Sequence, residues 1–195
     1  MPAFAWMEVR LSDGPVRSRC AELLLPHLDS AYNLARWLSR NDADAEDIVQ
    51  DALERALKYA SGLQGNNAKA WFLTIVRHAC YDWIGRNRPA ELMPGDNTDA
   101  IEAAADSRPT PEESAIAAAD ARALMRAIVA LPVGFREVLL LREQEDMAYR
   151  DIARIVDIPI GTVMSRLARA RGLLRRSPLL HAVAAPSPRA ARNER

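Results

Sequence analysis

The side chains with the clearest chemistry are arginines that recur in a short stretch near the C-terminal end of the chain. They are Arg166, Arg169, Arg171, Arg175 and Arg176, and no acidic residue lies among them. A basic helix of this kind fits the major groove of DNA, where guanidinium groups bind phosphates and base edges. The alternative is a solvated basic helix within a helical hairpin.

The residues just before these arginines favour DNA binding, because residues 149–176 have the pattern of a helix-turn-helix. Ala153 is small where the two helices must approach closely. Asp157 follows where the turn needs a left-handed residue, a conformation that Asp tolerates better than most residues. A miniature core is predicted from the apolar positions Ile152, Val156, Val163 and Leu167.

A second pattern is an acidic stripe at helical spacing. It consists of Asp44, Asp47, Asp51 and Glu54, with Gln50 beside them. Taken alone, such a stripe is usually a solvated helix face. The functional interpretation is a docking surface for a basic partner helix.

A third pattern combines basic side chains with aromatic side chains in residues 70–88. The basic residues are Arg77, His78, Arg86 and Arg88, and the aromatic residues are Trp71, Tyr81 and Trp83. Such a surface can hold single-stranded nucleic acid through backbone charge and base stacking. Each aromatic residue alone is more often a core residue. We predict that Phe72 and Trp83 are core and that Arg77 and Tyr81 face outward.

Residues for catalysis are scarce. The sequence has no glycine-rich phosphate loop, no His-Glu-x-x-His motif and no nucleophile elbow. His78 and Cys80 are too few, and poorly placed on one helix, to hold a metal. We therefore expect neither an enzyme nor a cofactor or metal site.

The elements that must position these residues are all predicted to be helices. Apolar residues recur at helical spacing and Ala, Leu and Arg dominate the composition. Pro26 is expected to divide or kink the first segment, and residues 62–69 are expected to form a loop. The predicted helices cover residues 19–40, 43–60, 70–86, 111–130, 134–145, 149–156 and 162–176.

The fold class is therefore all-α, with two small helical domains joined by an acidic linker. The linker is rich in proline and in acidic residues. The chain has 26 basic and 26 acidic residues, so a DNA-binding protein of this composition must segregate its charges. We predict an arm (1–18), a first domain (19–88), the linker (89–111), a second domain (112–176) and a flexible tail (177–195).

The location suggested by the sequence is the cytoplasm. The two cysteines, Cys20 and Cys80, have no metal-type spacing and give no disulfide framework. The first residues lack the apolar run of a signal peptide, and no apolar run approaches the length of a membrane span.

Together these motifs resemble the extracytoplasmic-function (ECF, group IV) sigma factors of bacterial RNA polymerase. The run DAEDIVQDAL from Asp44 resembles their region-two signature, and AWFLTIVRHACYDWIGRNR from Ala70 resembles their promoter-melting helix. FREVLLLR from Phe135, YRDIA from Tyr149 and GTVMSRLARAR from Gly161 resemble region four. His78, Met164 and Asp157 depart from the residues usual in the family.

The resemblance implies a role for each surface. Asp47, Gln50, Asp51 and Glu54 would bind the coiled coil of the polymerase's largest subunit, and the flap would be a further contact. The minus-ten element of promoter DNA would meet Asn66, Asn67, Lys69, Trp71, Arg77, His78, Tyr81, Arg86 and Arg88. The minus-thirty-five element would meet Thr162, Met164, Ser165, Arg166, Arg169 and Arg171.

The resemblance predicts a transcription initiation factor, commonly held inactive by an anti-sigma factor and of the kind used in stress responses. Two other functions stay open. A stand-alone helix-turn-helix regulator would explain residues 149–176 but not residues 44–88. An adaptor that mimics a sigma factor would bind a protein and never melt DNA.

Overall fold

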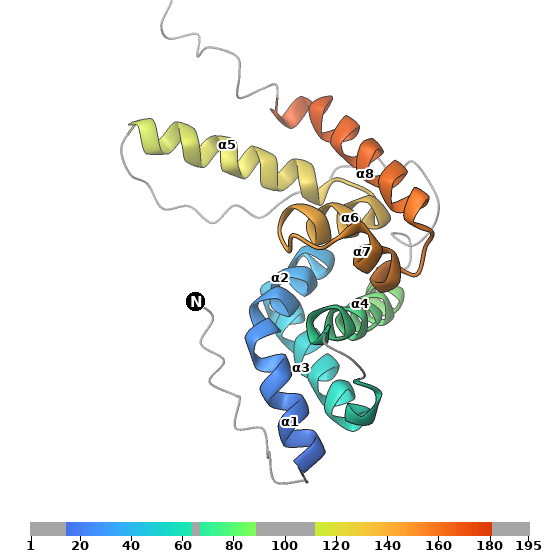
Figure 1. The fold of residues 1–195 in the computed structure, drawn as a ribbon. Helices are drawn as coiled ribbons and strands as arrows, with labels where there is room; N and C mark the ends of the chain where they lie inside the picture. Colours follow the sequence, from blue (N-terminus) through green and yellow to red (C-terminus); the bar gives the residue numbers. More distant parts are fainter. Residues whose placement is uncertain (1–14, 64–66, 89–111, 181–195) are drawn as a thin grey trace, which may run out of the picture.

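The computed structural model describes residues 15–63, 67–88 and 112–180, and along 112–120 only the course of the helix. Every regular element in these ranges is a helix, which confirms the all-α prediction (Figure 1). The linker (89–111), residue Asn66, most of the arm and the end of the tail lie outside the described residues.

The N-terminal half is a bundle of four helices. Helix α2 packs on α3 and α4, α3 packs on α4, and α1 contacts α3 and α4. The 3-10 turns η1 and η2 connect the helices. The bounds are α1 Pro15–Leu24, η1 Leu25–His27, α2 Leu28–Ser39, α3 Asp42–Lys58, η2 Ala60–Gly62 and α4 Ala68–Asn87.

The turn η1 contains Pro26, so the predicted interruption of the first helical segment is confirmed. Helix α1, however, begins at Pro15 rather than at residue 19. Proline suits the first turn of a helix because its φ is already helical and no N–H is needed there. The predicted start of the first helix at residue 19 was therefore too late.

Two asparagines start the helices that carry the candidate residues. The Asn41 side chain accepts hydrogen bonds from the N–H groups of Ala43 (2.8 Å) and Asp44 (3.2 Å), as an N-cap does. The Asn67 side chain accepts one from Ala70 (3.0 Å). This second cap starts α4 at Ala68, so the predicted loop ends earlier than expected and Lys69 is helical.

The C-terminal half contains α5 Glu112–Val129, α6 Val133–Glu143, α7 Tyr149–Val156 and α8 Ile160–Arg175. Helix α5 runs out to one side, whereas α6, α7 and α8 pack together (Figure 1). Asp157 has the predicted left-handed conformation, with φ of 55°. The predicted miniature core is confirmed, since its four members are buried: Ile152, Val156, Val163 and Leu167.

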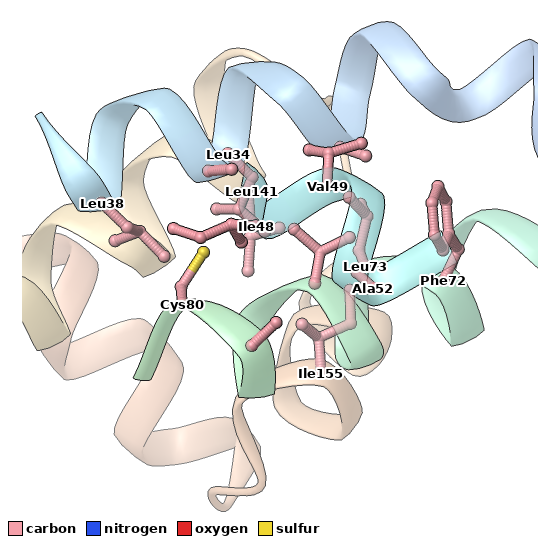
Figure 2. Close-up of a cluster of buried hydrophobic side chains, with 14 of the residues drawn as sticks. Leu34, Leu38, Ile48, Val49, Ala52, Phe72, Leu73, Cys80, Leu141 and Ile155 are labelled. Atoms are coloured by element: carbon pink, nitrogen blue, oxygen red, sulfur yellow. The ribbon is translucent and has the colours of Figure 1, made fainter. Parts of the chain in front are cut away.

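The two halves share one hydrophobic core. Helix α4 packs on α7, and α2 packs on α6. Figure 2 shows Leu141 of α6 and Ile155 of α7 among buried side chains from α2, α3 and α4. Removing apolar surface from water contributes about 25 cal/mol of stability per Å². The contact between the two halves is therefore stabilising.

A buried arginine reinforces this junction. Arg136 of α6 is fully buried and donates to the carbonyl oxygens of Val129 (2.9 Å), the last residue of α5, and of Leu131 (2.8 Å) in the turn that follows. It also donates to the carbonyl oxygen of Trp37 in α2 (3.1 Å). Arg136 therefore ties the two halves together by hydrogen bonds as well as by packing.

Candidate nucleic-acid interface

Helix α8 buries one face and turns the other outward. Val163, Leu167 and Ala170 are buried against α6 and α7. On the outer face, Ser165 and Arg169 are exposed and Met164 is 54% exposed. Ser165 donates only locally, to the Thr162 carbonyl oxygen (3.1 Å). The apolar spacing of the helix thus presents the predicted DNA-reading residues to solvent.

The arginines of α8 differ in their partners. Arg166 Nη1 lies 3.5 Å from Glu137 Oε1, and Arg171 Nη2 lies 2.5 Å from Glu143 Oε1. The hydrogen bonds that Arg171 donates to the Glu143 carboxylate raise the pKa of Arg171. Arg169 has no ion-pair partner among the residues that the structure describes.

The acidic stripe lies on the outer face of α3, as predicted. Asp47, Gln50 and Glu54 are exposed, and Gln50 donates to Glu54 (3.4 Å). Asp51 is half-buried and pairs with Arg55 (2.7 Å), which in turn binds Asp82 of α4 (2.8 Å). The stripe is thus open to a partner and is held against α4 at one point.

The start of α4 contacts the C-terminal half. Asn67 donates from its amide to Asp151 Oδ1 of α7 (3.2 Å). Lys69 Nζ lies 2.9 Å from the Glu145 carboxylate and donates to the Glu145 carbonyl oxygen at 3.1 Å. Both residues were predicted to contact DNA.

Further along α4, Arg77 and Tyr81 do not face outward, so that prediction was wrong. Both donate to Glu137 Oε2 of α6 at 2.9 Å, and the Arg77 guanidinium lies over the Tyr81 ring. The carboxylate of Glu137 is only 1% exposed. The packing of α7 on α4, and of α6 on α2 and α7, brings this acid to the two side chains, which the sequence of α4 alone does not indicate.

The pKa values of Glu137, Arg77 and Tyr81 are shifted by their burial and by one another. Burial raises the pKa of Glu137, although Arg77, Tyr81 and Arg166 act in the opposite direction. Burial alone would lower the pKa of Arg77, but the Glu137 carboxylate reverses this and the pKa is raised. Burial also raises the pKa of Tyr81, whose hydroxyl therefore stays protonated and donates.

The other predicted residues of α4 are spread over its surface. His78 and Arg86 are exposed, and Trp71 is half-buried. Arg88 lies over the Trp83 ring, 5.4 Å from guanidinium carbon to ring centroid. Phe72 is fully buried, as predicted, whereas Trp83 is only partly buried and packs against the core rather than within it.

Three acids of the C-terminal half were missed by the sequence analysis: Glu137, Glu145 and Asp151. The signal for one of them is its position, because Glu137, together with Arg136 beside it, interrupts a run that is otherwise apolar from Val133 to Leu141. An acid there must find a partner when the helix is buried. Nothing in the sequence indicates that the partner lies in α4.

The structure also bears on metal binding and on membrane insertion. In the described ranges, no group of His, Cys, Asp or Glu side chains is arranged to hold a metal ion. No helix within these ranges is long and apolar enough to cross a membrane.

Comparisons with known proteins agree with this arrangement. Residues 23–89 match the family model for Sigma-70 region 2, and residues 121–174 match that for Sigma-70 region 4. The ECF RNA polymerase sigma-E factor of Haemophilus influenzae is 31% identical over 147 residues, which cover 72% of this chain and 77% of that protein. The chain belongs to the ECF family of RNA polymerase sigma factors.

Other sigma factors extend the comparison. SigM of Mycobacterium tuberculosis is 34% identical, covering 80% of this chain and 74% of SigM. A probable sigma factor of Xanthomonas campestris, RfaY, is 34% identical, but this chain spans only 36% of its length. The sigma factor RpoE of Bartonella quintana, solved with the anti-sigma factor NepR, has a TM-score of 0.63 and 30% identity, covering 82% of this chain and 95% of RpoE.

Proposed function

We propose that this ECF sigma factor binds core RNA polymerase and directs promoter-specific initiation by reading the minus-ten and minus-thirty-five elements. The protein lends specificity and stabilises the melted strand, while catalysis stays with the polymerase, so it is not an enzyme and needs no cofactor. Its place of action is the cytoplasm, where polymerase and promoter DNA are found.

The observation that carries this proposal is that two separate faces point outward on one packed body. Asp47 and Glu54 of α3 are exposed in region 2 (residues 23–89), and Met164, Ser165 and Arg169 are exposed in region 4 (residues 121–174). A stand-alone DNA-binding regulator needs only the second face. An acidic face that attracts a basic partner supplies the first contact with polymerase.

The roles of single residues are part of the proposal. Asp47, Gln50, Asp51 and Glu54 bind the coiled coil of the largest subunit, and region 4 contacts the flap. The residues of α4 and the loop before it bind the minus-ten element, and those of α8 bind the minus-thirty-five element. The division into two domains with a linker at 89–111 belongs to the same proposal.

We also propose control by an anti-sigma factor. The RpoE protein of Bartonella quintana was solved in complex with one, and it shares the fold and 30% of aligned residues with this chain. A partner that covers the acids of α3 would keep the protein from polymerase.

The test is run-off transcription with core polymerase on DNA upstream of its own gene and on other candidate promoters. Wild-type protein should give specific transcripts, and the double variant Asp47→Lys/Asp51→Lys should give none. The matched control is Glu22→Lys/Asp29→Lys, which makes the same charge change on exposed acids outside the stripe. Control variant and wild type should be equally active.

The same assay separates the alternatives. Salt-sensitive DNA binding without any transcript, on promoters that a related sigma factor transcribes, would favour a stand-alone regulator. Transcription that survives Arg166→Ala/Arg169→Ala would favour an adaptor that acts through a protein partner.

A further inference from the structure

Two large apolar side chains lie uncovered at the start of α8. Ile160, the first residue of the helix, is 44% exposed, and Met164, one turn later, is 54% exposed. Residues four apart in a helix lie on the same face, so the two side chains form one apolar strip, which the small exposed Ala168 continues. We call Ile160 and Met164 the apolar pair. The pair is separate from Val163 and Leu167, which are buried.

The surroundings of the apolar pair are mainly basic. Ile160 lines a shallow hollow together with Arg150 and Arg154 of α7, and Asp157 is the only acid among the described residues that line it. Both arginines are exposed, and so is Arg169 further along α8. Cations around an apolar strip favour a polyanionic partner that also offers apolar groups. Duplex DNA is such a partner.

The apolar pair also lies where a helix-turn-helix reads bases. Residues near the N-terminus of the second helix contact base edges in the major groove. The apolar group that a base pair presents there is the C5 methyl of thymine. The side chains of Ile160 and Met164 have no hydrogen-bond donor, so they cannot read the polar base edges as arginine does. The unbranched Met164 side chain can adapt its shape to such a contact.

We propose that the apolar pair reads the C5 methyl of thymine in the minus-thirty-five element and thereby sets part of the promoter specificity of this protein. The inference rests on the proposed binding of α8 to that element. Arginines hold the helix on the phosphates without reading the sequence. The apolar pair separates thymine from cytosine, because cytosine has no methyl group at C5.

The test removes the methyl group without changing base pairing. The probe is a fluorescein-labelled duplex of the promoter that gives the strongest run-off transcript, and each thymine of its minus-thirty-five element, on either strand, is replaced in turn by deoxyuridine. Fluorescence anisotropy follows its binding to core polymerase assembled with the full chain, against core polymerase alone. At the contacted position, the replacement should lower the affinity of wild type by roughly fourfold, the effect of removing one methyl group from an apolar contact.

Three double variants locate the contact. Ile160→Ala/Met164→Ala should bind the thymine duplex more weakly and should bind the thymine and deoxyuridine duplexes equally. Ile160→Val/Met164→Leu keeps two apolar side chains and should keep the preference for thymine. The matched control is Leu124→Ala/Met125→Ala, which shortens two apolar side chains of similar exposure, 44% and 42%, on α5. The control should prefer thymine as wild type does, and circular dichroism confirms that each variant is folded.

The other outcomes overturn the inference in different ways. Equal affinity of wild type for the thymine and deoxyuridine duplexes at every position would show that no methyl group is read. A preference that persists in Ile160→Ala/Met164→Ala would assign the reading to other residues. If that variant binds the promoter as wild type does but gives no transcript, the apolar pair serves a protein partner instead.

These failures are separate from a failure of the proposed function. If wild type directs specific transcripts but shows no preference for thymine, the inference fails and the proposed function stands. If wild type directs no transcript from any promoter, the proposed function fails and the inference fails with it.

Discussion

Helices α4 and α8 are both proposed to contact promoter DNA, but the structure leaves the proposed DNA face of α8 more open than that of α4. The proposed DNA face of α8 points to solvent, whereas Asn67, Lys69, Arg77 and Tyr81 of α4 are bound to acids of region 4. The types of residue on a helix thus indicate what it can bind. They do not indicate which partner, DNA or protein, holds it in the free chain.

The difference follows from how many sides of each helix are apolar. Helix α8 has a single apolar stripe and packs on α6 and α7. Helix α4 packs on α2 and α3 and also on α7. Its half-buried Trp71 and Ile75 lie beside the main stripe and pack against the core. A helix that is apolar on more than one side is expected between two layers.

The largest effect should come from breaking the hydrogen bonds of Arg136. The change Arg136→Met keeps much of the volume but leaves the carbonyl groups of Val129, Leu131 and Trp37 without their donor. Hydrogen bonds to charged groups contribute about 1.5–3 kcal/mol each, so the free energy of unfolding should fall by about 3 kcal/mol or more. Chemical denaturation followed by circular dichroism measures it.

The control for this prediction is Arg150→Met, because Arg150 is exposed on α7. It should leave the unfolding midpoint close to that of wild type. An Arg136→Met protein as stable as the control would mean that α2 and α6 are not joined as the structure has them, and that α4 is less firmly covered.

A somewhat smaller effect is expected from Ile155→Ala, which shortens a fully buried side chain of α7 in the shared core (Figure 2). Such a truncation costs about 2–4 kcal/mol. All four tryptophans, Trp6, Trp37, Trp71 and Trp83, precede residue 89, so their fluorescence reports on the N-terminal half. The unfolding midpoint measured by tryptophan fluorescence should therefore shift, although the substituted residue lies in region 4.

If the two halves unfold independently, the unfolding midpoint measured by circular dichroism would fall. The midpoint measured by tryptophan fluorescence would stay at its wild-type value. That result would contradict one cooperative core. The matched variant Ile155→Val should shift both signals together by about 1 kcal/mol.

Arg169→Ala should act on DNA binding alone. Arg169 is exposed, so its loss should cost about 1–2 kcal/mol of affinity for minus-thirty-five duplex and leave the melting temperature unchanged. If it contacts a phosphate, the slope of log affinity against log salt should become shallower by about 0.9. Anisotropy titrations at several salt concentrations measure both.

Arg166→Ala is the variant to compare with Arg169→Ala, because Arg166 pairs with the buried Glu137. It should lose both affinity and stability, since a buried carboxylate is left with one fewer cation. Equal effects of the two substitutions on stability would show that the Glu137–Arg166 contact contributes nothing.

Much of the fold could be predicted from the sequence, because local signals define it. The cap at Asn41, the left-handed Asp157 and the core of Ile152, Val156, Val163 and Leu167 all depend on residues close in the chain. The contact between Arg77 and Glu137 could not, because these two residues are 60 positions apart in the chain. Helical spacing gives the face on which a residue lies but not the helix that covers it.

The smallest expected effect concerns pH. His27, at the end of η1, has a pKa lowered first by burial and then by Lys69, while Glu145 opposes the shift. The folded protein therefore binds fewer protons than the unfolded chain, in which a histidine titrates near pH 6.5. Stability that is present above about pH 6.5 should be lost progressively as the pH falls below that value toward the lower pKa of His27 in the folded protein.

The measurement is the melting temperature of wild type and His27→Gln between about pH 7.5 and 5.5. Wild type should lose more stability on acidification than the variant, and His78→Gln, at an exposed site, should behave as wild type. A proton on His27 adds positive charge near the Lys69–Glu145 pair, where it repels Lys69. The loss should therefore be accompanied by opening at the start of α4, and it should leave minus-thirty-five binding by α8 unchanged.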